Sequence, residues 1–439
     1  MKNRKSWPGP LAKKIILQAK RFCATTTVDS DFVPSPLKRG NGVWLYDADG
    51  NKFLDFCAGV GVSNCGHGNR EIEKAITGHL RRTGRLQYIH TDFYNPEAVK
   101  LSGVLAQMVK RALKSEREYK VFLCNSGTEA NEAGIKLSFA ARPKRKKIIA
   151  FRNGFHGRTL GALPTLWKEV CRRDYPMAYE VVWLNFPRAG FPDYIAYFLR
   201  ELEDLEKSAG DCNAVIIEMV QGQGGIYVAD KEAVEVLSKF CHRHDILIHI
   251  DEVQTGCGRT GRFLATEYYS GFQPDIITLA KGVANGFPLG ATVFRGDLDW
   301  KELGRHSNTF GGNALGAATA LATLDYLKEH QLSEYAFVIG KIVDWELKEL
   351  SRKYAPRVAN PRGLGLIRAV DFLDANGNPD KALRHRIIQE GYRLGLILVD
   401  AGDAAIRIMP PLVITIKELG KGLRLFDQAI ENALKGEKK

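Results

Sequence analysis

The stretch Ile246-Leu-Ile-His-Ile-Asp-Glu-Val-Gln-Thr-Gly256 (ILIHIDEVQTG) places two carboxylates directly after an apolar segment. Residues 246–250 predict a buried strand, and Asp251 and Glu252 follow it. A carboxylate at the end of a buried strand loses hydration, so it needs a partner that stabilises its charge. The stretch therefore raises the question of which positive group faces Asp251.

Strands and helices alternate around this stretch. Apolar strands are predicted over 121–124, 147–151, 214–218, 275–279 and 291–294, and helices over 127–141, 193–207 and 231–244. Such alternation predicts an α/β domain on a mostly parallel sheet. Ligands of these sheets bind at the carboxyl ends of the strands, and Ser126, Glu218, Asp251 and Lys281 stand at such ends.

The two ends of the chain have a different pattern. Residues 43–56 predict a hairpin that turns at Asp49-Gly50, followed by helices over 70–82 and 97–114. After about residue 315, a helix of small residues leads to a long helix over 333–354, and shorter strands and helices follow. We expect a large domain over 76–330 and a smaller α+β domain over 331–439, which the N-terminal segment 1–75 joins.

Composition limits the classes of protein that need to be considered. The 439 residues contain no apolar run long enough for a membrane helix, so no membrane partner is expected. The formal charge is +13, and its densest run is Arg142-Pro-Lys-Arg-Lys-Lys147. This run indicates either a nucleic-acid or acidic-ligand patch or a solvated loop. We favour the loop and expect no nucleic acid, because no aromatic residues interleave with the run.

The cysteines indicate the compartment. Eight of them are scattered along the chain without a Cys-x-x-Cys pair, which argues against a metal site or a redox pair. A reducing compartment fits best, so a cytoplasmic location is expected. The basic N-terminal segment lacks acids and leaves a mitochondrial presequence as the alternative.

The segment Asn125-Ser-Gly-Thr-Glu-Ala130 lies between a predicted strand and a predicted helix. Ser126 and Glu129 fit a capping box, which alone is a common helix start. The functional interpretation is an anion site, because Gly127 lets an anion approach and the free amides of the first turn point towards it. The segment by itself leaves both interpretations open.

Two further motifs also follow strands. Asn153-Gly-Phe-His-Gly157 displays Phe155 between glycines, either buried in a turn or lying flat on a planar ligand. Lys281 comes directly after the strand over 275–279, where lysine is unusual. Either its ammonium extends to solvent, or burial lowers its pKa so that the amine can form an imine.

Together these parts suit one cofactor, pyridoxal 5'-phosphate. Asp251 would keep the pyridine nitrogen protonated, and Lys281 would form the imine and carry protons. A pyridinium is therefore the positive group expected to face Asp251. Glu252 has no such role, and a loop arginine, Arg259 or Arg262, is its candidate partner.

The sequence resembles the class III, ornithine/4-aminobutyrate-type aminotransferases of fold type I over nearly its whole length. The shared motifs lie at 42–47, 125–131, 154–158, 217–225, 251–256, 258–262, 280–281 and 308–312. The resemblance implies a seven-stranded sheet in the large domain and dependence on pyridoxal phosphate. Archaeal members are the most similar, on the stretches at 24–27, 306–310 and 406–411. Members resembling these include 4-aminobutyrate and ornithine aminotransferases and amino-acid racemases.

The resemblance also implies roles for the matching cofactor residues. Phe155 and Val253 would stack on the two faces of the ring, and Gln254 would approach the ring hydroxyl. The other cofactor-binding positions are Ser126, Gly127 and Thr128 for the phosphate, His156 and Glu218 beside the cofactor, and Asp251 and Lys281 as the catalytic pair.

Two further roles concern the neighbouring subunit and the substrate. Thr309 would reach the phosphate of a neighbouring subunit, so that a homodimer or a higher homo-oligomer shares its active sites. Arg407 would bind the substrate's α-carboxylate with its two-pronged guanidinium.

Gln223 departs from the family pattern. Many ω-aminotransferases read Val-Gln-Gly-Glu-Gly-Gly where this chain has Val220-Gln-Gly-Gln-Gly-Gly225. Gln223 can accept a hydrogen bond from Arg407 but cannot cancel its charge. This favours α-amino acids in both half-reactions, or a racemase, unless another acid substitutes.

Asp92 lies in a polar and aromatic loop that the family places at the mouth of the active site. It could attract the distal ammonium of ornithine or lysine, or it could simply stabilise a helix N-terminus.

We therefore expect an aminotransferase that moves an amino group from a 4-aminobutyrate- or ornithine-type donor to 2-oxoglutarate by a ping-pong mechanism. An amino-acid racemase on the same scaffold is the alternative. A non-enzymatic binding protein is disfavoured, because Lys281 and Asp251 are both present. The expected partners are an amino acid, a 2-oxo acid and further copies of the chain.

Overall fold

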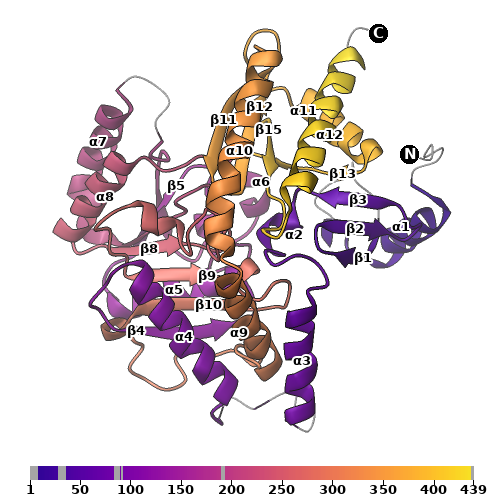
Figure 1. The fold of residues 1–439 in the computed structure, drawn as a ribbon. Coiled ribbons are helices and arrows are strands. Elements are labelled where there is room, and N and C mark those ends of the chain that lie inside the picture. The colour runs from indigo at the N-terminus through magenta and orange to yellow at the C-terminus, as the bar shows by residue number, and fades with distance from the viewer. Residues whose placement is uncertain (1–7, 28–35, 84–88, 90–91, 189–192, 437–439) are drawn as a thin grey trace.

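A seven-stranded sheet forms the centre of the molecule in the computed structural model, which describes residues 8–27, 36–83, 89, 92–188 and 193–436 (Figure 1). The order is β4-β10-β9-β8-β7-β5-β6. In that order the strands are Tyr119–Cys124, Gly290–Arg295, Ile276–Leu279, Leu247–Asp251, Cys212–Ile217, Lys147–Phe151 and Glu180–Leu184. β10 runs antiparallel to both of its neighbours, and the other pairs are parallel. The mostly parallel sheet predicted from the sequence is confirmed.

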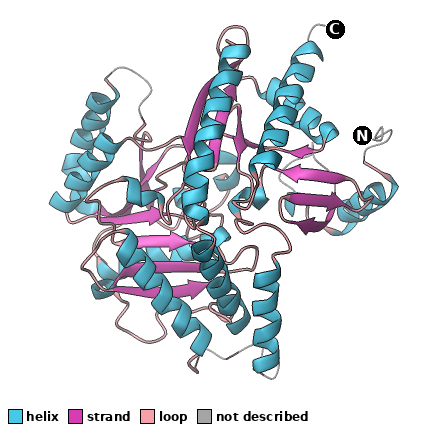
Figure 2. Ribbon diagram, viewed as in Figure 1, coloured by secondary structure: helices cyan, strands magenta, loops and turns pink. Residues whose placement is uncertain are grey.

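Helices cover both faces of this sheet, as Figure 2 shows. On one face, α7 (Tyr194–Leu205) and α8 (Lys231–Arg243) pack Phe198 and Leu237 against Ile149, Val215 and Ile248. On the other face, α5 (Gly127–Ala141) packs against the alternate residues of the same strands, Ile148, Ile216 and Leu247. Because both faces are covered, these strands read as continuous apolar runs.

A second, antiparallel sheet is built from the C-terminal part of the chain. Its order is β11-β12-β15-β14, and its strands are Val358–Leu364, Ile367–Phe372, Ala405–Ile408 and Val399–Ala401. The helices of this part are α10 (Leu332–Lys353), α11 (Lys381–Leu394) and α12 (Ile416–Lys435). α10 packs against β11 and β12, and α11 packs against α12.

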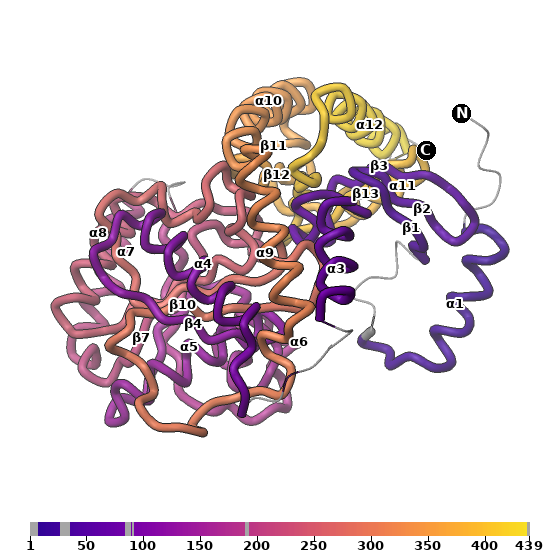
Figure 3. Tube along the Cα trace, turned by 60° about the horizontal axis from the view of Figure 1, so that its bottom comes forward, coloured from indigo at the N-terminus to yellow at the C-terminus, as the bar shows by residue number. Residues whose placement is uncertain are grey.

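A third sheet joins the two ends of the chain. β1 (Leu37–Asn41), β2 (Trp44–Asp47) and β3 (Lys52–Asp55) form an antiparallel meander, which confirms the predicted hairpin. β3 also pairs in parallel with β13 (Leu396–Ile397), so N-terminal strands lie beside α11 and α12 (Figure 3). The domain boundaries predicted at residues 75/76 and 330/331 stay a prediction.

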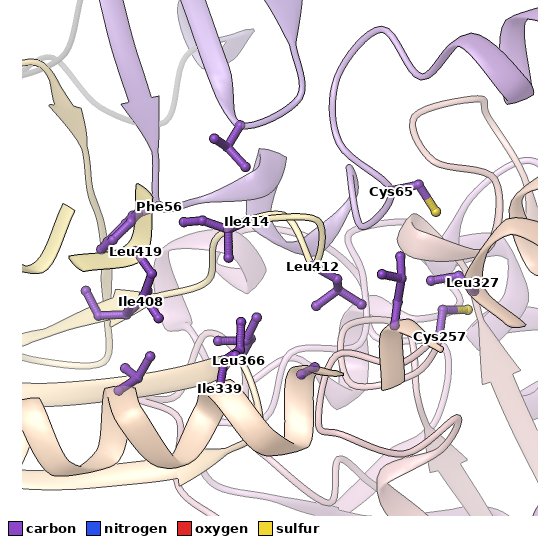
Figure 4. Close-up of a cluster of buried hydrophobic side chains, with 14 of the residues drawn as sticks. Phe56, Cys65, Cys257, Leu327, Ile339, Leu366, Ile408, Leu412, Ile414 and Leu419 are labelled. Carbon is purple, nitrogen blue, oxygen red and sulfur yellow. The ribbon is translucent and has the colours of Figure 1, made fainter. Parts of the chain in front are cut away.

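One hydrophobic core connects these parts. Figure 4 shows Phe56 close to Ile408, Ile414 and Leu419 from the C-terminal part, with Ile339 of α10 further along the same cluster. The cluster continues to α4 (Pro96–Ala112), which packs on β4, and to α9 (Ala314–Glu329) and α3 (Arg70–Arg82), which pack beside it. Among the residues described, no helix is both long and apolar enough to cross a membrane.

The predicted helices and strands agree with the observed ones within a few residues, but eight α-helices and strands of the described chain have no counterpart in the prediction. They are α1 (Pro10–Phe22), β1, the short helices α2 (Ala58–Gly61) and α6 (Glu169–Arg172), β6, β11, β15 and α12. β6 is a partly exposed edge strand with a charged first residue, so its apolar signal is weak. α12 does carry a start signal, a capping box between Thr415 and Glu418.

Candidate active site

A cavity of about 1300 Å³ opens where the carboxyl ends of the central strands meet the second sheet. Its volume exceeds that of a typical single-ligand pocket, which leaves room for a cofactor and a substrate together. Most of the residues selected from the sequence line it: Ser126, Gly127, Thr128, Phe155, His156, Glu218, Gln223, Asp251, Val253, Gln254, Lys281 and Arg407. Strand–helix connections supply most of them, as expected for a parallel sheet.

The N-terminus of α5 forms a narrow notch at one end of the cavity. Ser126 caps the helix by accepting the Glu129 amide at 3.3 Å, and Glu129 in turn accepts the Asn125 amide at 2.8 Å. A Cβ on Gly127 would lie 2.7 Å from Cγ1 of Val253, so no side chain fits there. Gly127 therefore packs directly against Val253, and the first turn of α5 carries no side chain at this position, which suits the approach of a phosphate to its amides.

Thr128 joins this notch to the loop after β5. Its Oγ1 accepts hydrogen bonds from the backbone amides of Arg158 at 3.2 Å and Thr159 at 3.3 Å. Position 157 requires glycine. Its φ is 131°, and a Cβ there would lie 2.1 Å from that same oxygen. The tight loop expected around Phe155 is thus held directly against the helix start.

Asp251 is buried at the end of β8 and makes three hydrogen bonds. Oδ2 accepts from Asn131 Nδ2 at 2.7 Å and lies 2.8 Å from Nδ1 of His156, and Oδ1 accepts from the Val253 amide at 2.9 Å. Burial alone would raise the pKa of Asp251. The hydrogen bonds and the nearby imidazole outweigh burial and hold the pKa below its ordinary value, so the side chain is an anion.

Asn131 orders the surroundings of this anion. Its Nδ2 also donates to the carbonyl of His156 at 2.9 Å, and its Oδ1 accepts from the hydroxyl of Thr278 at 2.6 Å. Asn131 on α5 and Thr278 on β9 therefore fix the position of Asp251 from two neighbouring elements. Neither residue was predicted from the sequence, although Asn131 lies within a shared motif at one turn's distance from Thr128.

Glu218 lies beside the same loop, directly after β7. Its two oxygens accept the backbone amides of Phe155 at 3.0 Å and Gly222 at 2.8 Å. Burial raises the pKa of Glu218 to about 7, with the Asp251 charge acting in the same direction and His156 opposing it. This carboxyl therefore titrates near neutral pH.

Lys281 follows β9 and adopts a left-handed backbone conformation with φ of 47°, which is uncommon for a residue with a side chain. Burial lowers the pKa of its ammonium to about 8, and the charge of Arg407 adds to the effect against Asp251 and Glu218. Its Nζ forms no hydrogen bond or ion pair with another described residue. A substantial fraction of this amine is consequently neutral and nucleophilic near pH 8.

Gln254 presents a polar atom without a partner. Its Nε2 donates to the carbonyl of Val60 at 3.3 Å, and its buried Oε1 has no hydrogen-bond partner within the described chain. Since buried polar atoms are normally paired, this oxygen is available to a ligand hydroxyl or amine.

Val60 belongs to a turn that the sequence analysis missed. Residues 58–61 all have positive φ, including 50° at Ala58 and 62° at Val60. Consecutive left-handed residues with side chains are costly and concentrate at functional sites. The signal available in the sequence was the pair of glycines in Ala58-Gly-Val-Gly61.

Arg407 on β15 is buried at the opposite wall of the cavity. Its Nε donates to the Asp400 carbonyl at 2.9 Å, and Nη2 donates to Gln223 Oε1 at 3.2 Å. The structure thus contains the hydrogen bond anticipated between Arg407 and Gln223. Arg407 forms no ion pair with any carboxylate in the described ranges, so its charge is open to an anionic ligand.

Thr309 and Asp92 lie elsewhere. Both side chains are exposed, and neither is among the residues that line the cavity of a single chain. The residues His90 and Thr91 next to Asp92 lie outside the described residues. The helix that follows is capped by Asn95 and carries Glu97 in its first turn, so Asp92 does not supply its N-terminal acid. The roles of Thr309 and Asp92 stay predictions.

The prediction that a loop arginine pairs with Glu252 was wrong. Glu252 is fully buried and accepts hydrogen bonds from the amides of Ala265 at 3.0 Å and Thr266 at 2.8 Å, and from the hydroxyls of Thr255 and Thr266. Burial raises the pKa of Glu252 despite these bonds. Its function is to hold the start of a short helix, a local cap that no charge pairing in the sequence reveals.

Arg259, a predicted partner of Glu252, is also fully buried, but it donates its hydrogen bonds to other groups. It donates to the carbonyls of Leu366 at 3.0 Å and Pro410 at 2.6 Å and to Oδ1 of Asn64 at 2.6 Å. It thereby ties the large sheet's loops to the C-terminal part.

These features fit pyridoxal phosphate. The notch at Gly127 suits a phosphate, the anionic Asp251 suits a protonated ring nitrogen, and the unpartnered Gln254 oxygen suits a ring hydroxyl. Lys281 supplies an amine of lowered pKa for covalent attachment. When bound, this cofactor draws electrons away from the α-carbon of an amino acid.

Comparisons with known proteins agree with this assignment. The family model for class III aminotransferases matches residues 25–430. The acetylornithine aminotransferase of Lactococcus lactis is 36% identical over 401 residues, which cover 91% of this chain and 97% of that protein. The acetylornithine aminotransferase of Archaeoglobus fulgidus is 34% identical over 393 residues, covering 89% of this chain and 94% of that protein.

Solved structures show the same architecture. A Bacillus anthracis aminotransferase superposes with a TM-score of 0.87 at 25% identity, covering 97% of this chain and all of that one. An (S)-enantioselective ω-transaminase from Thermomicrobium roseum gives 0.87 at 28% identity, covering 96% of this chain and 99% of that one. The fold and the cavity thus define a pyridoxal-phosphate-dependent enzyme of fold type I. Within that class, the chain belongs to the class III aminotransferase family.

Proposed function

We propose that this enzyme transfers an amino group from an amino acid of the ornithine or 4-aminobutyrate type to 2-oxoglutarate, in two half-reactions at one site. The observation that carries the proposal is a buried Arg407, without an ion-pair partner in the described part of the chain, in the same cavity as the amine of Lys281. The acetylornithine aminotransferases among the relatives support a donor of the ornithine type.

Each residue of the cavity has a defined task in this proposal. Arg407 binds a carboxylate of the amino acid or of the oxo acid with its two-pronged guanidinium. The amine of Lys281 takes the proton from the α-carbon and returns it later, which a pKa of about 8 permits near neutral pH. The Asp251 anion stabilises positive charge at the position it faces, and the apolar walls at Phe155 and Val253 exclude water.

A second function, amino-acid racemisation, is favoured by Gln223. An acid at this position would neutralise Arg407 whenever an ω-amino group occupies the site, but Gln223 only accepts a hydrogen bond. Arg407 then keeps its charge for an α-carboxylate throughout. A racemase would use the same cavity but return the proton to either face of the α-carbon.

We further propose a homodimer or higher homo-oligomer in which the exposed Thr309 completes the phosphate site of a neighbouring subunit. Asp92 is the proposed contact for a distal ammonium. All eight cysteines are free, in keeping with the cytoplasmic location predicted from the sequence.

A single half-reaction distinguishes the two functions. The holoenzyme is mixed with excess amino acid and no oxo acid, in separate tubes for L-ornithine, N-acetyl-L-ornithine, 4-aminobutyrate, L-leucine and L-alanine. Loss of the cofactor's visible absorbance band with one equivalent of oxo product establishes the aminotransferase and its donor. A persistent band with growing D-amino acid, measured by chiral chromatography, establishes the racemase. If none of the five compounds produces either change, both proposals are contradicted.

A further inference from the structure

Three groups hold Arg407, and they belong to two segments that touch one another. The carbonyl of Asp400 accepts from Nε, while the carbonyl of Gly222, at 3.5 Å, and Oε1 of Gln223 accept from Nη1 and Nη2. The turn between β14 and β15 contacts the segment around Gln223, because the Gly402 amide donates to the Gln223 carbonyl at 2.7 Å. A movement of this turn would therefore disturb the groups that hold Arg407.

Arg384 holds that turn from behind. It lies on α11 with 5% of its surface exposed, and its Nη1 donates to the carbonyls of Gly402 at 3.2 Å and Asp403 at 2.9 Å. Its Nη2 pairs with Oδ2 of Asp400 at 3.2 Å. One guanidinium thus binds three residues of this segment: the carboxylate of Asp400 and the carbonyls of Gly402 and Asp403.

Close packing leaves the turn little freedom. Gly402 has φ of 53°, and a Cβ there would lie 3.0 Å from the carbonyl oxygen of Gly224. Arg384 Nη2 also lies 3.0 Å from Nε2 of His385, whose side chain lines the cavity. The guanidinium is therefore connected both to the support of Arg407 and to the cavity wall.

Stability alone is a poor explanation for this arrangement. Burial lowers the pKa of Arg384, and its buried Nε has no hydrogen-bond partner among the residues described. A buried ion pair often adds little or nothing to stability relative to apolar residues of the same volume. The arrangement is explained if Arg384 fixes the orientation of the Arg407 guanidinium, because bidentate binding of a carboxylate depends on that orientation.

We infer that Arg384 is a positioning residue that orients Arg407 for carboxylate binding, through the Asp400–Asp403 turn and Gln223. The inference rests on the proposed function, in which Arg407 binds the substrate's carboxylate. Arg384 itself touches neither the reacting atoms nor the carboxylate. Its loss should weaken the binding of carboxylates without changing the chemistry at Lys281.

The test compares three holoenzyme variants: Arg384→Gln, Arg384→Lys and, as a matched control, Arg393→Gln. Arg393 lies on the same helix, but its side chain is exposed and pairs with Glu390. The probe is glutarate, a dicarboxylate without an amino group, titrated against the cofactor's absorbance. The KM and kcat of the best donor are measured in parallel.

Arg384→Gln is expected to raise the Kd of glutarate and the KM of the donor about tenfold, with kcat within about twofold and full cofactor content. Arg384→Lys should fall between this variant and the wild type, and Arg393→Gln should match the wild type. If Arg384→Gln lowers the melting temperature but leaves glutarate binding unchanged, the inference is overturned.

Arg407→Lys separates the proposed role of Arg407 from the inferred role of Arg384. If Arg407→Lys leaves glutarate binding unchanged, the proposed role of Arg407 fails, and the inference fails with it. If Arg407→Lys weakens binding but Arg384→Gln does not, only the positioning role is refuted. In the double variant, Arg384→Gln should add almost nothing to the loss from Arg407→Lys, because the two residues act as one unit.

A further variant keeps the test decisive if Arg384→Gln does not fold. Asp400→Asn removes the ion pair with Arg384 but retains the carbonyl that binds Arg407. It should raise the Kd of glutarate about two- to fivefold, and an unchanged Kd would refute the inference.

Discussion

His156 and Asp251 form a buried pair in which Nδ1 of the imidazole lies 2.8 Å from Oδ2 of the carboxylate. Asn131 binds the same oxygen at 2.7 Å, whereas Oδ1 receives one hydrogen bond, from the Val253 amide. Oδ1 therefore has the greater remaining capacity to accept a hydrogen bond, from a cationic group of a ligand.

Replacing Lys281 with alanine should abolish turnover. The variant loses the amine that attaches the cofactor and carries the α-proton, so kcat should fall by at least about three orders of magnitude. Steady-state transamination and the absorbance of the purified protein provide the measurement. The control is Lys239→Ala, which removes an exposed lysine of α8 paired with Glu235. Retained activity without added amine would refute the role of Lys281.

Replacing Asp251 with asparagine should leave pyridoxal phosphate bound but slow the proton transfer. The amide cannot stabilise a protonated ring nitrogen, so we expect the half-reaction to slow at least about a hundredfold. Cofactor content and stopped-flow absorbance are the measurements, and the exposed Asp204→Asn on α7 is the control. A wild-type rate would mean that the partner of the ring nitrogen is another residue.

Replacing Gln223 with glutamate should change which donor is preferred. The new carboxylate would stand where Oε1 now accepts from Arg407 and would neutralise its charge. The KM for α-amino acids should rise about tenfold, while the half-reaction with 4-aminobutyrate should become faster. Gln428→Glu on the exposed side of α12 is the control. Unchanged relative rates would show that position 223 does not set donor preference.

Glu218 should make the apoprotein less stable as pH rises towards neutrality. Its pKa is about 7 in the folded protein because of burial, against an ordinary value of 4.5, so the folded state retains a proton that the unfolded state releases. The free energy of unfolding should therefore fall between pH 4.5 and 7, by about 3 kcal/mol, and level off above that.

Glu218→Gln tests this pH dependence. The variant should lose the slope between pH 5 and 7 and show in its place a constant offset of about 1 kcal/mol, because one backbone amide loses its acceptor. Denaturant unfolding of both apoproteins at pH 5, 6, 7 and 8 is the measurement. Parallel curves for the two proteins would show that another group causes the dependence.

The cofactor side of the cavity could be predicted from the sequence because it depends on local patterns. A polar residue directly after an apolar strand has a fixed place in a parallel sheet, and this placed Ser126, Glu218, Asp251 and Lys281 correctly at one edge. Gln223 was placed beside Arg407 by likeness to a family motif, and the structure contains that contact.

The remaining features depend on contacts between distant segments. Asn131 meets Asp251 and Thr278 only once α5 packs on the sheet, and Arg384 meets Asp400 only after α11 folds against β14. The partner of Glu252 was predicted wrongly because charge favoured an arginine, while the folded chain offered amides and hydroxyls. Neither pattern nor charge in the sequence carries such information.

The pairing of β3 with β13 has a consequence for the order in which a new molecule becomes functional. A chain made from its N-terminus exposes the strands that contact the cofactor long before residues 396–397 and Arg407 leave the ribosome. The strands around Lys281 are then complete while the wall that selects the substrate is still missing. The N-terminal sheet and the wall at Arg407 are therefore completed together, in the last stage of biosynthesis, because both need the segment that contains β13 and β15.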